Sequence, residues 1–143
     1  MTHSLSALVD HSRIVAVDEA AIPSLPQATD QRELWFVNCH YHESMSTLAA
    51  PQLLHEAKED ALLVLRRLAE RSSLQDYACV VVTIYAHIPV AGAARPARRR
   101  AYRATVRCCD LPQRGSLLTQ ELFAQLASHE NSELDDVSEL LPH

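Results

Sequence analysis

Residues 51–72 constrain the fold more than any other part of the sequence, because their apolar side chains recur at steps of three and four. This spacing gathers Leu54, Ala57, Ala61, Val64, Leu65 and Leu68 on one side of an α-helix. The opposite side is charged and consists of Glu56, Glu59, Asp60, Arg67 and Arg71. Pro51 suits the first helical turn, where its missing N–H costs no hydrogen bond. A helix with such a broad apolar side must cover another layer of the protein.

The segments on either side of this helix are rich in aromatic and β-branched residues, which favour strands. Residues 33–43 alternate between a core face and a second face that becomes polar toward its end. The predicted core face holds Trp35, Val37, Cys39 and Tyr41, and the second face holds Leu34, Phe36, Asn38, His40 and His42. Residues 77–88 form the strongest predicted strand, with a continuous apolar face of Ala78, Val80, Val82, Ile84, Ala86 and Ile88.

Three further elements complete the predicted fold. A short strand is expected at residues 13–18, and another at 101–109 with Tyr102, Ala104, Val106 and Cys108 toward the core. The linker at 90–100 is short, which predicts an antiparallel hairpin between 77–88 and 101–109. A second helix is expected at 117–128, with Leu118, Leu122 and Leu126 on one side.

The order of these elements predicts a single α+β domain over residues 1–143. It is a two-layer sandwich in which one long amphipathic helix covers a mostly antiparallel sheet of about four strands, with a C-terminal helix added. Residues 1–12 are expected to be a loose N-terminus, and residues 129–143 an acidic C-terminal segment. No motif is specific enough to indicate a family.

The composition excludes several classes of protein. There are only two glycines, Gly92 and Gly115, so neither a phosphate-binding P-loop nor a dinucleotide-binding loop can be built. No apolar run reaches the roughly 20 residues of a membrane-spanning helix, and no secretion signal precedes the first strand. We therefore expect a cytoplasmic protein that does not bind a membrane. Its four cysteines are expected to be reduced thiols. The arginine-rich composition, with a single lysine, suggests a bacterial source with a GC-rich genome.

Three histidines form a candidate metal site. His40 and His42 project from the same face of their predicted strand about 7 Å apart, a spacing that two zinc ligands can use. His87 ends the neighbouring strand and can supply a third ligand. Histidines exposed at a sheet end are the alternative, because the chain has no other zinc-binding pattern. We therefore expect no cofactor, and zinc bound by these histidines is the alternative.

An arginine cluster forms a candidate surface for nucleic acid or another anionic partner. Seven of the twelve arginines lie between residues 95 and 114. The candidate binding residues are Arg95, Arg98, Arg99, Arg100, Arg103 and Arg107. The net charge of −5 speaks against nucleic acid, and a solvated hairpin tip is the alternative.

Nucleophilic catalysis finds little support in the sequence. Cys39 and His40 are neighbours on a strand and therefore face opposite ways, so they cannot form a catalytic pair within it. Cys39 and Cys108 are expected in the core. Cys109 is the one thiol with an outward orientation beside arginines, a setting that can lower a thiol pKa.

The acidic C-terminal segment is a candidate partner-binding element. Leu134, Val137, Leu140 and Leu141 share one side of a predicted helix, which can pack on a partner, on a second copy or back onto its own sheet. Without a catalytic set, the favoured function is a non-catalytic accessory or regulatory module that acts through protein–protein contacts as a homodimer. The alternatives are a nucleic-acid-binding regulator that uses residues 95–107, and a small metal- or ligand-binding protein that uses His40 and His42.

Overall fold

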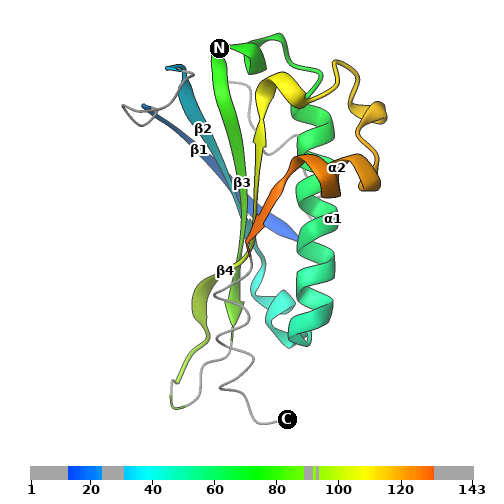
Figure 1. The fold of residues 1–143 in the computed structure, drawn as a ribbon. Helices are drawn as coiled ribbons and strands as arrows, with labels where there is room; N and C mark the ends of the chain where they lie inside the picture. The colour runs from blue at the N-terminus through cyan, green and yellow to red at the C-terminus, as the bar shows by residue number, and fades with distance from the viewer. Residues whose placement is uncertain (1–12, 24–30, 89–91, 93, 131–143) are drawn as a thin grey trace.

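The structure, a computed structural model, describes residues 13–23, 31–88, 92 and 94–130. Within them the chain forms a five-stranded sheet and two α-helices, so the predicted α+β class is confirmed (Figure 1). The elements are β1 (Ile14–Ile22), β2 (Glu33–Tyr41), α1 (Ala50–Leu68), β3 (Tyr77–Ile88), β4 (Ala97–Arg107), α2 (Gln120–Leu126) and β5 (Ser128–Glu130). Short 3₁₀ turns join them, among them η2 (Glu43–Thr47), η4 (Cys108–Asp110) and η5 (Gly115–Leu117).

The strands lie in the order β1-β2-β3-β4-β5, and each pairs with its neighbours in sequence. The pairs β1–β2, β3–β4 and β4–β5 are antiparallel, so the sheet is mostly antiparallel as predicted. The pair β2–β3 is parallel, because α1 carries the chain back to the end of the sheet where β2 began. The predicted hairpin of the two long strands is confirmed by the β3–β4 pairing.

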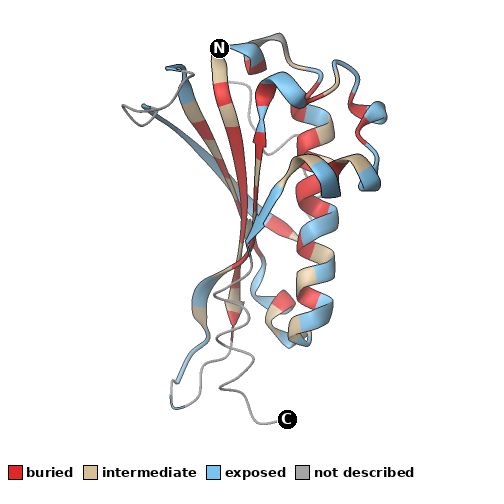
Figure 2. Ribbon diagram, in the orientation of Figure 1, coloured by how far each residue is buried: buried red, intermediate tan, exposed pale blue. Residues whose placement is uncertain are grey.

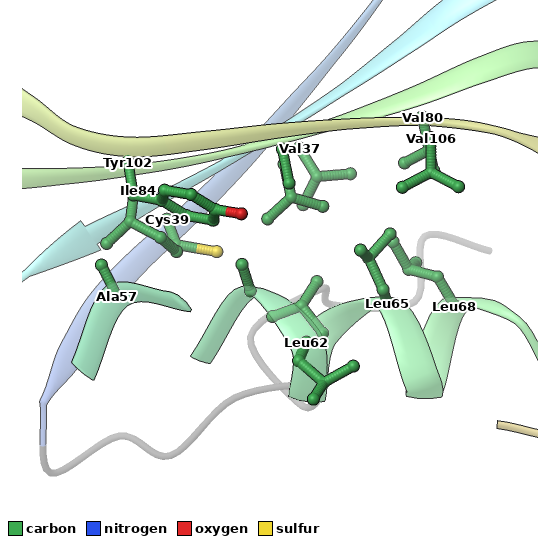
Figure 3. Close-up of a cluster of buried hydrophobic side chains, with 14 of the residues drawn as sticks. Val37, Cys39, Ala57, Leu62, Leu65, Leu68, Val80, Ile84, Tyr102 and Val106 are labelled. Atoms are coloured by element: carbon green, nitrogen blue, oxygen red, sulfur yellow. The ribbon is translucent and has the colours of Figure 1, made fainter. Parts of the chain in front are cut away.

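The core lies between α1 and one face of the sheet. Leu65 and Leu68 of α1 lie opposite Val80 and Val106, and all four side chains are buried (Figure 3). Each such side chain contributes about 1.5–3 kcal/mol when it leaves water. The predicted core faces of β2 and β3 are buried throughout, as are Tyr102, Ala104, Val106 and Cys108. Figure 2 shows the buried residues concentrated on the strands and on the side of α1 that faces them.

Several predicted boundaries are wrong. Helix α1 ends at Leu68 rather than at residue 72. Strand β4 begins at Ala97, so its first four residues are not part of a linker. Helix α2 begins at Gln120 because the Thr119 side chain accepts a hydrogen bond from the Leu122 N–H at 3.1 Å. Residues 129 and 130, assigned to the acidic segment, belong to β5, which pairs with β4.

The segment after β4 is fixed to α1 at a close backbone approach. Gly115 lies so near the Arg66 carbonyl that a Cβ atom there would sit 1.9 Å from its oxygen. Arg66 Nε donates a hydrogen bond to the Leu118 carbonyl at 2.7 Å. Leu118 and Phe123 are buried in the same core. These contacts hold α2 on the side of the sheet that α1 covers (Figure 1).

Asp60 departs most clearly from the predicted helix pattern. It is expected on the outer, charged side of the helix, but it is buried and the residue is only 4% exposed. The hydroxyl of buried Tyr41 donates a hydrogen bond to its carboxylate. Arg13 donates to both Asp60 and Glu56, one turn apart on α1. Burial raises the pKa of Asp60, and the bonds from Tyr41 and Arg13 offset part of that rise. The three partners tie the β1–β2 edge of the sheet to α1.

Within the described ranges, no helix combines the length and apolarity that crossing a membrane requires.

We expect Tyr41→Phe to lower the free energy of unfolding by about 1–3 kcal/mol, because it leaves a buried carboxylate without one of its donors. Urea denaturation measures the change. Tyr77→Phe is the matched control, because it removes the hydroxyl of a half-buried tyrosine in the same sheet. Equal stability of the Tyr41→Phe variant and the control would contradict a structural role for the Asp60 network.

Candidate functional site

The sheet has a second face that neither α1 nor α2 covers, and we call it the open sheet face. Both described helices lie on the other side of the sheet (Figure 1). Residues of β2 and β3 that alternate with the core residues occupy this face, among them Phe36, His40, Thr83, Tyr85 and His87. Most are partly exposed, whereas Thr83 and Val81, in the middle of β3 on this face, are buried. Among the described residues, no helix packs on this face (Figure 1).

An irregularity at Ala101 decides which side chains of β4 reach the open sheet face. Tyr102 pairs with Ile84, but Arg100 pairs with Tyr85, so Ala101 is one extra residue in β4. Ala101 and Tyr102 are consecutive, and both are fully buried. Such a bulge shifts the alternation of the strand by one residue.

The bulge places four arginines on one face. Beyond Ala101 toward the C-terminus, Arg103 and Arg107 pair with Thr83 and Cys79 of the open sheet face. On the other side of the bulge, Arg98 pairs with His87 and Arg100 with Tyr85. Regular alternation would have turned the second pair toward the core. We call Arg98, Arg100, Arg103 and Arg107 the arginine row.

Two of the six arginines singled out in the sequence lie outside this row. Arg99 is exposed and pairs with Ala86, a residue of the core face. Arg95 lies in the connection before β4 and is also exposed. It helps to line a hollow of about 790 Å³ together with His42, Glu43, Ser44, Ser46, His87 and Pro96. Because His87 pairs with Arg98, the hollow adjoins the end of the arginine row.

Arg98 is held by two rings of the neighbouring strands. Its guanidinium carbon lies 4.1 Å from the centre of the Tyr85 ring, close enough for a cation–π contact. Its Nε donates to Nδ1 of His40 at 3.3 Å. The His40 and Tyr85 rings stack, with centres 5.3 Å apart and planes inclined by 12°. The row therefore begins at a cluster of one cation and two planar rings.

Asp18 of β1 completes this cluster on its far side. A guanidinium only donates, so Nδ1 of His40 accepts and the ring proton lies on Nε2. That Nε2 lies 2.7 Å from Asp18 Oδ2, and Asn38 Nδ2 donates to the other carboxylate oxygen at 2.8 Å. Burial disfavours the ionised carboxyl of Asp18, but these hydrogen bonds and the charge of Arg98 outweigh it and lower its pKa. Asp18 fixes His40, and His40 in turn orients Arg98.

The same contacts disfavour the zinc hypothesis. Nδ1 of His40 accepts from Arg98, and Nδ1 of His42 accepts from the Ser44 backbone N–H at 3.0 Å. His42 and His87 line the hollow, whereas His40 belongs to the cluster with Asp18. Among the described residues, no group of three His, Cys, Asp or Glu side chains is arranged to hold a metal ion. A guanidinium in contact with the central imidazole favours an anion over a metal cation.

Carboxylates offset part of the row's charge at its other end. Arg103 Nε donates to Thr83 Oγ1 at 3.0 Å, and its Nη1 lies 3.9 Å from Glu130 of β5. Arg107 lies 4.0 Å from Asp110. Exposed pairs of this length contribute little to stability. Carboxylates therefore lie near both ends of the row, with Asp18 bound to His40 at the Arg98 end.

The cysteines behave largely as the sequence predicts. Burial and two nearby acids raise the pKa of Cys39 to about 12, as suits a core thiol rather than a nucleophile. Cys108 is buried, although it lies in η4 rather than on the strand. Cys109 is exposed, and its Sγ lies 3.5 Å from Arg107 Nη2. Its exposure confirms the predicted outward orientation of Cys109.

Sequence reasoning missed the residues that organise this site. Asp18 gave no signal in a short predicted strand, and Tyr85 lies on the side of its strand opposite the predicted apolar face. No residue type marks the bulge at Ala101 in the sequence. The one local sign is that two apolar residues, 101 and 102, follow each other in an otherwise alternating segment. Leu134, Val137, Leu140 and Leu141, the predicted partner-binding residues, lie outside the described residues.

Comparison of the chain with protein-family models, with curated proteins and with solved structures found no match. The geometry of the open sheet face is therefore the basis for assigning a function.

We expect deletion of Ala101 to leave the amides of residues 85–88 protected from exchange with solvent. Without Ala101, Arg100 directly precedes Tyr102, so regular alternation keeps Arg98 and Arg100 on the open sheet face. Hydrogen exchange measured by NMR reports protection residue by residue. Deletion of Ala104, which pairs with Val82 on the core face, is the contrasting variant and should reduce protection along β3, because it turns Arg103 toward the core. Loss of protection after deletion of Ala101 would contradict its being the extra residue of the strand.

Proposed function

We propose that this protein is a non-catalytic binding module that holds single-stranded nucleic acid across its open sheet face. The observation that carries the proposal is the bulge at Ala101, which gathers four arginines of β4 on that face. Residues 98–107 of a strand span on the order of 30 Å. A row of this length can contact several successive phosphates, and such contacts supply most of the affinity of sequence-independent binders.

The neighbouring strands supply planar groups for unpaired bases. Phe36, His40 and Tyr85 are partly exposed; Tyr85 of β3 lies beside the arginines of β4, and Phe36 and His40 lie one strand farther, on β2. Bases that are free of a partner strand stack on aromatic rings and on guanidinium planes, with about 1–3 kcal/mol for each aromatic contact. Bases paired in a duplex are stacked on one another and cannot reach these rings. This arrangement favours a single strand over a duplex.

The acids near the row set a limit on the affinity. Asp18, Glu130 and Asp110 each lie within 4.0 Å of the His40 ring or of a row arginine. The whole chain carries a net charge of −5. Attraction is therefore confined to the open sheet face, and binding should weaken steeply as salt is added.

We expect Arg98→Gln/Arg103→Gln to weaken binding of an oligothymidylate of about 12 nucleotides, a length within the usual site sizes. Each charge-assisted contact contributes about 1.5–3 kcal/mol, so the loss should be tenfold or more. The slope of log affinity against log salt should become shallower by about 1.4, at roughly 0.7 per phosphate on a single strand. Fluorescence anisotropy at several salt concentrations measures both.

Arg67→Gln/Arg114→Gln is the matched control, because it removes the same charge from α1 and from the segment before η5. The control should bind as the wild type does. The proposal fails if the wild type does not bind the oligonucleotide, or if both double variants lose the same affinity. Equal binding of polyglutamate would also overturn it, and would point instead to an acidic protein as the partner.

The role in protein–protein contact and the homodimer stay predictions, and one observation favours them. Strand β1 is an edge of the sheet, where it pairs with β2 alone in the described part of the chain. Val15 and Ile22 of this edge are 57% and 47% exposed. An exposed edge of nine residues can pair with the same edge of a second copy. The expected cytoplasmic location and bacterial source also remain predictions.

We expect Val15→Lys/Ile22→Lys to convert a dimer of the wild type into monomers, because charged side chains oppose pairing of sheet edges. Analytical ultracentrifugation measures the mass in solution. Leu117→Lys, which changes an equally exposed apolar residue away from β1, should leave the dimer intact. A monomeric wild type, or a dimer in both variants, would refute assembly through β1.

A further inference from the structure

A groove on the opposite side of the molecule is separate from the open sheet face. It lies where α1, α2 and β5 meet, and its volume is about 370 Å³. If each non-hydrogen atom takes roughly the 30 Å³ of a liquid water molecule, the groove holds about a dozen such atoms. That is the size of a small organic molecule rather than of a peptide or a nucleotide chain.

The floor of the groove is apolar and fixed. Leu62 of α1 is 4% exposed and Phe123 of α2 is 5% exposed, and both belong to the hydrophobic core. Ala124 adds a small side chain to the lining. Because Arg66 and Leu118 hold the start of α2 against α1, the two walls keep a set distance. A rigid apolar floor favours a ligand with an apolar body.

The polar lining favours a single negative charge. Lys58, the one lysine of the chain, lines the groove, with Nζ 5.9 Å from the centre of the buried Tyr102 ring. His129 of β5 also lines it, and its Nδ1 is hydrogen-bonded to the Tyr102 hydroxyl. Burial raises the pKa of Tyr102, so the phenol keeps its proton and donates it to Nδ1. The imidazole then carries its own proton on Nε2, as a second donor.

The one acid in the lining limits the ligand's charge. Glu59 lies 3.4 Å from the His55 ring, and both line the groove. A dianion such as a phosphate monoester would face Glu59 with a charge that a single ammonium does not balance. A monoanion can pair with Lys58 and the His129 N–H while Glu59 stays paired with the His55 ring.

We propose that this groove binds a small carboxylate with an apolar body. The carboxylate pairs with Lys58 and accepts from His129, and the apolar body lies on Leu62 and Phe123. The site shares no residue with the open sheet face, so its test is independent of nucleic-acid binding.

Phenylacetate is the probe, and its uncharged analogue phenylacetamide is the control ligand. In ¹H–¹⁵N NMR titrations of the full chain, phenylacetate should bind saturably and shift the amides of residues 58–62, 123–124 and 129. Lys58→Met should weaken phenylacetate binding by about tenfold and leave phenylacetamide binding unchanged. Arg114→Met, an exposed cation outside the groove, should change neither. Ala124→Trp, at an exposed position of α2, should fill the groove and abolish binding of both ligands.

Three results would overturn the proposal. The first is no saturable shift with phenylacetate, and the second is a set of shifts on β3 and β4 of the open sheet face. The third is equal binding of phenylacetate and phenylacetamide, because recognition would then not depend on the charge. The spectra of Lys58→Met and Ala124→Trp away from the groove show directly whether each variant retains the wild-type fold.

Discussion

The fold depends on the contact between α1 and one face of the sheet. Leu65 and Leu68 of α1 are fully buried against β3 and β4, and the chain has no second long helix in its described part. One helix covers one face, so the other face of the sheet remains open among the described residues. The Asp60 network adds a polar tie at the β1–β2 edge, where Tyr41 and Arg13 reach the same carboxylate. These contacts decide which face of the sheet the described helices cover.

The bulge at Ala101 is the reason why four arginines of β4 lie together on the open sheet face. In a regular strand, residues 98 and 100 would share a face with Tyr102 and lie toward the core. With one extra residue, they join Arg103 and Arg107 beside His40 and Tyr85. The Asp18–His40–Arg98 chain then fixes the first arginine in place. A preset side chain loses less conformational freedom on binding, which favours affinity.

The sequence predicts the regular parts of this structure well, because alternation and helical spacing follow from burial. The core faces of β2 and β3 and most of the apolar stripe of α1 follow directly from these two periods. The burial of Asp60 does not, since it depends on Tyr41 of β2 and on Arg13 just before β1, which no local pattern reveals. The short strand β5 exists only through its pairing with β4, and the bulge at Ala101 only through its register with β3. For the same reason, the histidines and arginines could be named from the sequence, but their grouping could not.

The most direct test of binding on the open sheet face is an NMR titration of the full chain with single-stranded oligothymidylate, followed at every assigned amide. We expect shifts at Tyr85, His87, Arg98, Arg100 and Arg103, with little change along α1. Shifts confined to α1 and α2, or no shifts at low salt, would contradict the assignment of the open sheet face as the binding surface.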